Sequence, residues 1–161
     1  MIRVGQGIDL HRIDEARTLV LGGVIIEEGP GLAGHSDADV LLHAITDAVL
    51  GAAALGDIGS HFPPSDPRYG HADSADFLRK ALELARAAGW EVGNIDSTIS
   101  TERPKLGPYI DHMRERVAEI AGCEVERVAV KAKTREGMDA VGRGEAMEAV
   151  AIVLLQGGAS R

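Results

Sequence analysis

Residues 35–59 read HSDADVLLHAITDAVLGAAALGDIG, and the rest of the chain is organised around this stretch. Its apolar residues recur with helical spacing over 40–52, which predicts a largely buried helix. Asp39, His43 and Asp47 are four residues apart, so a helix places them on one face. A histidine between two carboxylates on a buried helix is either a paired core residue or a metal ligand.

Residues at both ends of this helix mark its limits. Ser36 is placed to cap the N-terminus, and Gly56 is the predicted stop signal. Asp39 and Asp47 have two interpretations each. In the first, they hydrogen-bond to His43 and orient it as a metal ligand. In the second, Asp39 caps the helix and Asp47 is an exposed helix residue.

The composition restricts the class of protein. A chain of 161 residues is long enough for one domain over 1–161 with a real core, which the 3% aromatic content requires to be aliphatic. The formal net charge of −8 argues against nucleic acid or an anionic membrane as the main partner. Cys123 is the only cysteine, which excludes an internal disulfide. With neither a signal-peptide pattern nor a long apolar run, we expect a cytoplasmic protein.

The remaining periodicities predict five strand regions and two more helices. The strands are expected over 2–10, 19–26, 90–101, 125–133 and 145–155, and the helices over 73–89 and 108–122. Strands and helices mix along the chain, so we expect an α+β fold: a mixed sheet with helices packed on one face. The last strand is apolar almost throughout, which predicts that both of its faces are covered. Residues 156–161 are expected to form a frayed tail.

Two segments between these elements are predicted to be loops. Residues 59–70 contain three prolines, and they form either a mobile cover over an active site or a plain surface connection. Residues 134–144 contain several glycines and follow the strand over 125–133. Residues 56–59 could bind the hydroxyls of a polyol or simply form a turn.

A metal site is the strongest chemical candidate. Asp9 and His11 are two residues apart, so they share one face of an extended segment, and the helix could add His43. Two imidazoles and one carboxylate suit zinc and leave a fourth position open, as in catalytic zinc sites. From the residues alone, the alternative is two surface residues at a strand end and a core histidine.

A second cluster carries positive charge. Cations and a hydroxyl gather where the strand over 125–133 ends: Lys131, Lys133, Thr134 and Arg135. Such groups suit phosphate oxygens, and the neighbouring Glu136 suits a magnesium ion shared with those phosphates. The alternative is a solvated strand end with alternating charge.

Many segments, in order, resemble one known family. They are GIDLH (7–11), LGGV (21–24), AGHSDADV (33–40), HAITDA (43–48), GAAALGDIG (51–59), FPPSDP (62–67), RPK (103–105), VKAKT (130–134) and GRGE (142–145). Over nearly its whole length the chain resembles the 2-C-methyl-D-erythritol 2,4-cyclodiphosphate synthase family of the non-mevalonate isoprenoid pathway. The resemblance implies a homotrimer with its sheets towards the three-fold axis and active sites between adjacent subunits.

The resemblance also implies roles for individual residues. Zinc would bind Asp9, His11 and His43, and magnesium or manganese would bind Glu136. The methylerythritol phosphate end of the substrate would contact His35, Ser36, Asp57, Ile58, Gly59 and Asp66. The cytidine and its phosphates would contact Ser100, Thr101, Lys105, Leu106, Ala132, Lys133 and Thr134. Arg143 completes the substrate-binding set, and the catalytic residues would be Asp57, Lys133, Thr134 and Glu136.

The implied reaction is an intramolecular phosphoryl transfer. The 2-phosphate of 4-diphosphocytidyl-2-C-methyl-D-erythritol 2-phosphate attacks the β-phosphorus, closes a cyclic diphosphate and expels CMP. Two other functions stay open: a zinc-dependent phosphoesterase that releases a linear product, and a non-catalytic trimer that binds isoprenoid diphosphates.

The chain departs from the family pattern in three places. Lys133 replaces a hydroxyl residue, Arg135 replaces a threonine, and the stretch Met138–Ala140 lacks a phenylalanine that often lines an axial cavity in relatives. We expect Lys133 to contact the α- or β-phosphate directly.

Overall fold

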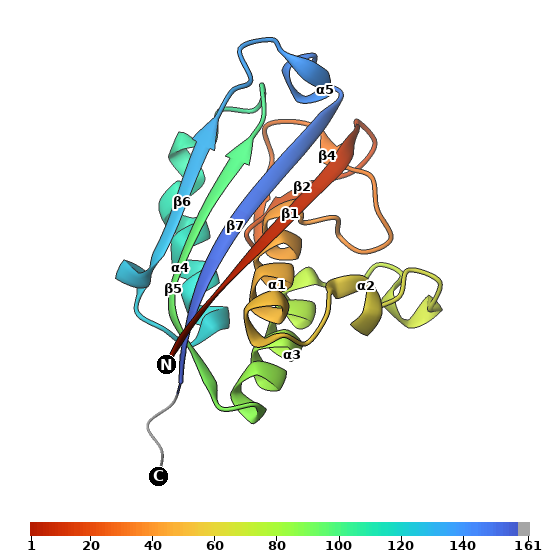
Figure 1. The fold of residues 1–161 in the computed structure, drawn as a ribbon. Helices are drawn as coiled ribbons and strands as arrows, with labels where there is room; N and C mark the ends of the chain where they lie inside the picture. Colours follow the sequence, from red (N-terminus) through yellow and green to blue (C-terminus); the bar gives the residue numbers. More distant parts are fainter. Residues whose placement is uncertain (158–161) are drawn as a thin grey trace.

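A computed structural model describes residues 1–157 and shows a mixed α+β fold (Figure 1). The strands are β1 (Ile2–Asp14), β2 (Leu19–Leu21), β3 (Val24–Ile26), β4 (Gly31–Leu32), β5 (Trp90–Ser100), β6 (Val128–Lys133) and β7 (Ala146–Gly157). The helices are α1 (Val40–Ala53), α2 (Ile58–His61), α3 (Ser74–Ala87), α4 (Ile110–Ala121) and α5 (Asp139–Gly142). Short 3-10 turns cover Pro67–Tyr69, Gly107–Tyr109 and Val125–Arg127.

Five strands form the main sheet in the order β4-β1-β7-β5-β6, while β2 and β3 form a separate hairpin. β7 pairs antiparallel with both β1 and β5, whereas β5 and β6 are parallel. A parallel pair needs a crossover connection, and α4 supplies it. The pairing of β5 with β7 shifts between Val92 and Asn94, on either side of Gly93.

Two glycines let α1 lie directly on β1. A Cβ atom at Gly5 would be 2.0 Å from the Ala48 carbonyl oxygen, and one at Gly7 would be 1.9 Å from that of Ala44. No larger residue fits at either position without moving the helix. The next inward-facing residues of β1 are Asp9 and His11, and they lie over the first turns of α1.

The opposite face of the sheet is exposed in the single chain. Helices cover only one face, as predicted, and the large apolar residues of the other face are 45–66% exposed: Ile2, Val4, Ile8, Leu10 and Ile152. The prediction that the last strand is covered on both faces is therefore wrong for the single chain. β7 buries Ala149, Ala151 and Val153 against the helices, while Ile152 on the other side faces solvent.

The limits of α1 differ from the sequence prediction. Asp39, not Ser36, caps its N-terminus, because the Asp39 carboxylate accepts from the Leu42 N–H at 3.0 Å. The helix ends at Ala53, before Gly56, because Ala54 adopts a left-handed conformation that satisfies the last carbonyls.

The two predicted loops contain helical turns, and β1 is longer than expected. Residues 59–70 include most of α2 and a 3-10 turn, and residues 134–144 include α5. The expected frayed tail at 156–161 is contradicted at Gln156 and Gly157, which belong to β7; its remaining residues, 158–161, lie outside the described part. Across residues 1–157, every helix is too short or too polar to cross a membrane.

Candidate metal centre and nucleotide cavity

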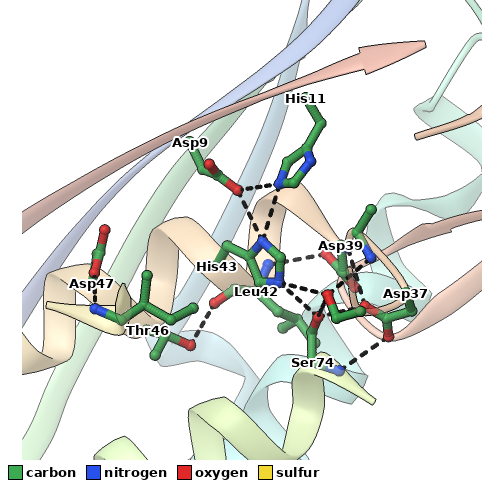
Figure 2. Close-up of polar contacts among 12 residues, drawn as sticks. Asp9, His11, Asp37, Asp39, Leu42, His43, Thr46, Asp47 and Ser74 are labelled. Carbon is green, nitrogen blue, oxygen red and sulfur yellow. Dashed lines mark hydrogen bonds and ion pairs between the residues drawn. The ribbon is translucent and has the colours of Figure 1, made fainter. Parts of the chain in front are cut away.

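Asp9, His11 and His43 converge on one point between β1 and α1 (Figure 2). The Asp9 Oδ2 atom lies 2.8 Å from His11 Nε2 and 2.9 Å from His43 Nδ1, and the two nitrogens are 3.2 Å apart. The three side chains are only 12–27% exposed. One oxygen and two nitrogen ligand atoms in a half-buried setting could hold a metal ion.

The local electrostatics favour a cation at this point. Burial alone would raise the pKa of Asp9, but the adjoining His11 and His43 rings, when protonated, outweigh burial and hold that pKa far below its usual range. Burial lowers the pKa of His11, and the neighbouring Asp9 more than reverses this effect. A carboxylate that stays ionised between two imidazoles fits the ligand set of a divalent metal.

A backbone carbonyl fixes the orientation of His11. Its Nδ1 atom is 2.6 Å from the Ala33 carbonyl oxygen, which can only accept a hydrogen bond. The proton of a neutral His11 ring is therefore on Nδ1, and the lone pair of Nε2 points to Asp9 and His43. Metal-binding histidines are held in this way by a bond to their other nitrogen.

Neither Asp39 nor Asp47 orients His43, so that interpretation is wrong. Asp39 is fully buried and accepts from the N–H groups of Leu42, Gly22 and Gly23. Burial raises the pKa of Asp39 to about 6, although these backbone bonds lower it. Asp47 accepts from the Ile58 N–H at 2.7 Å and so joins α1 to the start of α2. Burial also raises the pKa of Asp47.

The polar partners behind His43 are Ser74 and Ser36, and sequence reasoning missed the first of them. His43 Nε2 lies 2.8 Å from Ser74 Oγ and 3.2 Å from Ser36 Oγ. The pair Asp73-Ser74 predicted only the start of a helix, and α3 does begin there. The tertiary contact between α3 and α1 gives Ser74 its second role, so the local sequence carries no signal for it.

Asp9, His11 and His43 are called the metal group from here on. Some of the residues expected to contact the methylerythritol phosphate end lie beside it. Ser36 adjoins His43, while Asp57 caps α2 and Asp66 pairs with Arg68 at 2.6 Å. Hydrogen bonds from Ser60 lower the pKa of the exposed Asp57. Ile58 and Gly59 form the first turn of α2, and the exposed His35 accepts at its carbonyl from the His71 N–H.

Aromatic contacts hold the segment over 59–70 in place. Phe62 stacks on Phe77 of α3 with ring centroids 4.6 Å apart, and Tyr69 lies edge-on to both rings. Three of the five Phe, Trp and Tyr residues of this chain therefore meet at one place. The segment is anchored beside His43, which lies 6.1 Å from Phe77.

The residues expected to bind cytidine and its phosphates form a second cluster. A cavity of about 400 Å³, called the candidate nucleotide cavity or nucleotide cavity below, lies at the ends of β5 and β6. It is lined by Thr101, Glu102, Pro104, Lys105, Leu106, Gly107, Pro108, Ala132, Lys133 and Thr134. All the expected residues are present except Ser100, which is buried and pairs with Lys133 in the sheet.

Glu136 and Arg135 follow the cavity residues in the sequence, but their side chains contact different groups. Glu136 is exposed, has a left-handed backbone (φ 52°), and lies 3.4 Å from the Thr134 hydroxyl. The Arg135 guanidinium pairs with Glu148, and its backbone N–H donates to Glu102 at 2.7 Å. Arg135 thus ties the segment to the sheet and is directed at carboxylates of the protein.

Arg143 lies apart from both clusters. Its guanidinium pairs with Glu145 at 2.9 Å, which raises the pKa of Arg143, and the residue is not part of the nucleotide cavity. A separate hollow of about 670 Å³ lies next to Glu145 and includes Ala140 in its wall.

The metal group and the nucleotide cavity are on different strands. The first lies on β1, and β7 and β5 separate β1 from β6. At about 4.8 Å per strand, β1 and β6 are roughly 14 Å apart. The two clusters of one chain are therefore distinct features of its surface.

The comparisons with known proteins place this chain in a family. The chain belongs to the YgbB family, whose model matches residues 2–156. Two of its relatives, described next, are named 2-C-methyl-D-erythritol 2,4-cyclodiphosphate synthase. The protein from Moorella thermoacetica is 55% identical over 96% of this chain and 94% of its own length. The one from Chromobacterium violaceum is 56% identical over 96% and 98%.

Solved structures of the same family share the fold. A structure of 2C-methyl-D-erythritol-2,4-cyclodiphosphate synthase has a TM-score of 0.89 at 39% identity, covering 96% of this chain and 100% of that one. The CDP complex of IspF from Plasmodium falciparum has a TM-score of 0.85 at 34% identity, covering 98% and 97%. The bifunctional IspDF from Campylobacter jejuni has a TM-score of 0.94 at 39% identity, and this chain spans 42% of its length.

Proposed function

We propose that the chain converts 4-diphosphocytidyl-2-C-methyl-D-erythritol 2-phosphate into 2-C-methyl-D-erythritol 2,4-cyclodiphosphate and CMP. It would act as a phosphorus–oxygen lyase of isoprenoid precursor biosynthesis, as one domain over 1–161, in the cytoplasm. The observation that carries the proposal is the pairing of a metal-competent group with a nucleotide-sized cavity in a chain over 50% identical to named synthases.

Two metals belong to the proposal. Asp9, His11 and His43 would hold zinc, and Glu136 would hold magnesium or manganese together with the diphosphate. When bound, such metals supply Lewis-acid polarisation and charge neutralisation at phosphate oxygens. The chain carries a net charge of −8, so a polyanionic substrate depends on local cations.

The side chains of this chain would hold the two ends of the substrate together. Lys133, Thr134 and Lys105 surround the cavity where the diphosphate and cytidine would lie. Ser36 would take the other end, beside the metal group. A bond forms between an oxygen of the 2-phosphate and the β-phosphorus, and the bond from that phosphorus to the α-phosphate oxygen breaks. The leaving CMP keeps the electron pair. The reaction is intramolecular, and positioning holds the two reacting phosphates of the substrate in contact, so no protein nucleophile is needed.

A homotrimer would bring complementary clusters of adjacent subunits together. The exposed apolar residues of β1 and β7 support an assembly through this face of the sheet. The separation of the metal group from the nucleotide cavity supports active sites between subunits. Sedimentation at micromolar concentration checks this part, because a monomer would leave the apolar face unexplained.

Phosphorus NMR of the protein with the cytidylyl substrate and magnesium tests the reaction. We expect CMP together with a cyclic diphosphate, and we expect turnover to stop after complete metal removal and to return with zinc. CMP with a linear phosphate would replace the proposal with a phosphoesterase. No reaction in zinc-loaded protein would favour a binding protein, and turnover in fully metal-free protein would contradict the metal chemistry.

A further inference from the structure

We infer that Ser74 and Asp37 act as a relay that positions His43, by keeping its ring proton on Nε2 and its Nδ1 lone pair towards the metal group. Neither residue touches Asp9 or His11 in the contacts of the described chain. Both act through His43 and are therefore positioning residues. The inference rests on the metal site proposed above and explains what builds it.

The contacts of Ser74 define the relay (Figure 2). Ser74 is the first residue of α3 and is fully buried. Its Oγ atom lies 2.8 Å from His43 Nε2 and donates a hydrogen bond to the Asp37 carboxylate. The backbone N–H of Ser74 donates to the other Asp37 oxygen at 3.1 Å, so the carboxylate holds Ser74 by two bonds.

The direction of these bonds follows from hydrogen counting. A hydroxyl has one hydrogen, and a carboxylate can only accept, so Ser74 gives its hydrogen to Asp37. The Ser74 oxygen can then only accept from His43, and the Ser36 hydroxyl can give its own hydrogen to the Ser74 oxygen at 3.4 Å, so the proton of the neutral ring lies on Nε2. The Nδ1 atom of His43 is left with a lone pair directed at Asp9.

The same reasoning applies to His11, whose Nδ1 proton is directed at the Ala33 carbonyl. Three lone-pair atoms therefore meet at distances of 2.8–3.2 Å: Asp9 Oδ2, His11 Nε2 and His43 Nδ1. In this arrangement none of the three carries a hydrogen for the other two, so their mutual repulsion is relieved by a cation. The outer hydrogen bonds thus build the metal site before any metal arrives, and losing such bonds costs about 10- to 100-fold in metal affinity.

Two substitutions test the relay through zinc affinity, measured by competition with a chromophoric chelator and without any substrate. Ser74→Ala removes the acceptor of the Nε2 proton, and we expect zinc to bind about tenfold more weakly or worse. Ser74→Thr keeps the hydroxyl and should restore most of the affinity. Ser36, which is 3.2 Å from the same nitrogen, limits the loss in Ser74→Ala.

Asp37→Asn is the sharper test, because it keeps the size of the side chain and disrupts the relay. One Asp37 oxygen accepts from the Ser74 hydroxyl and the Asp39 N–H, and the other accepts from the Ser74 N–H, so the amide NH₂ group faces a donor in either orientation. With the NH₂ group towards the Ser74 hydroxyl, that hydroxyl gives its hydrogen to His43 Nε2 and the ring proton moves to Nδ1; with the NH₂ group towards the Ser74 N–H, the bond that holds Ser74 in place is lost. We expect zinc affinity to fall at least as far as in Ser74→Ala.

Two matched controls separate this effect from a general loss of structure. Ser97→Ala removes another buried hydroxyl, on β5, which donates to the Ala129 carbonyl of β6 at 2.9 Å. Asp73→Asn alters the carboxylate that caps α3 through the Ala75 N–H. Both should bind zinc within about twofold of the unaltered protein.

Nitrogen NMR of the zinc-loaded imidazoles gives a direct readout of the proton position. In the unaltered protein, His43 should carry its proton on Nε2 and zinc on Nδ1, and this signature should be lost in Asp37→Asn. Unchanged zinc affinity in both Ser74→Ala and Asp37→Asn, or a His43 proton on Nδ1, would overturn the relay alone. An unaltered protein that binds no zinc would overturn the relay and the metal site together. The cyclase reaction is judged separately, from its product.

Discussion

The two halves of the candidate site are built in different ways. The metal group is packed between β1 and α1, is 12–27% exposed, and has a hydrogen-bond partner behind each histidine. The phosphate segment over 133–136 lies at a strand end, with Lys133, Thr134 and Glu136 exposed. Folding therefore organises the first half, whereas under the proposed function the second half would depend on the substrate and its metal for its final arrangement.

This difference assigns distinct roles to rigid and open elements. A site on packed elements holds its ligands precisely, because neighbouring side chains fix each rotamer. An exposed strand end can adjust to a large substrate and let it leave. Changes beneath the metal group should accordingly alter stability and metal binding, while changes in the phosphate segment should alter only catalysis.

Gly7→Ala should cause the largest effect, because its Cβ would overlap the Ala44 carbonyl at 1.9 Å. We expect a loss of about 3 kcal/mol or more in the free energy of unfolding, and weaker zinc binding as His43 moves away from Asp9. Urea denaturation and chelator competition measure the two effects.

Gly51→Ala is the control for this substitution within α1. The nearest atom to its new Cβ would be the Gln6 carbonyl oxygen at 4.0 Å, so we expect up to about 1 kcal/mol of stabilisation from helix propensity. Equal stability of Gly7→Ala and the unaltered protein would show that α1 can shift without cost, against the close contact described above.

The helices and strand that form these packed parts could be predicted from the sequence for a physical reason. The period of apolar residues gave α1, α3 and α4, and the spacing of Asp9 and His11 placed both on one face of β1. Local patterns carry this information because helices and strands repeat their own geometry. The pairing of His43 with that strand followed from the resemblance and from the buried character of α1.

The parts that the sequence missed depend on contacts between distant elements. Ser74 meets His43 because α3 packs on α1, and Asp39 is buried because the β2–β3 turn donates to it. The aromatic anchor of the segment over 59–70 pairs Phe62 with Phe77 of α3. Arg135 is next to the predicted phosphate-binding residues in the sequence, yet its guanidinium pairs with Glu148 of β7. Local patterning cannot supply any of these pairings.

The pH dependence of stability should separate the buried carboxylates from the exposed ones. Burial raises the pKa of Asp39 from 3.8 to about 6, whereas hydrogen bonds lower the pKa values of the exposed Asp57 and the half-buried Asp66. A raised folded-state pKa means that the folded chain binds more protons than the unfolded chain between pH 3.8 and about 6. The contribution of Asp39 to stability is therefore present below pH 3.8 and is lost as pH rises through about 6.

The Asp39→Asn variant isolates this contribution, because the amide does not titrate. Between pH 4 and 7, the stability of the unaltered protein should fall relative to the variant by about 2 kcal/mol, with a slope of at most about 1.4 kcal/mol per pH unit near pH 5. Urea denaturation at each pH measures the difference. Parallel curves for the two proteins would mean that the three backbone N–H donors keep the Asp39 carboxylate ionised throughout.

Lys133→Thr should have the smallest effect and one limited to the phosphate half. Lys133 lines the nucleotide cavity and has an exposed side chain, and threonine is the kind of hydroxyl residue that resemblance suggests at this position. Removing one charge-assisted contact to a phosphate should lower kcat/KM about tenfold, or about 1.4 kcal/mol, with stability and zinc affinity unchanged. Lys131→Thr is the matched control, since Lys131 is also exposed on β6 but pairs with Asp96 and is not part of the cavity wall.

Steady-state kinetics with the cytidylyl substrate checks both variants. Equal kcat/KM values for Lys133→Thr and Lys131→Thr would remove Lys133 from the phosphate site. A parallel loss of zinc affinity in Lys133→Thr would show that the two halves are coupled.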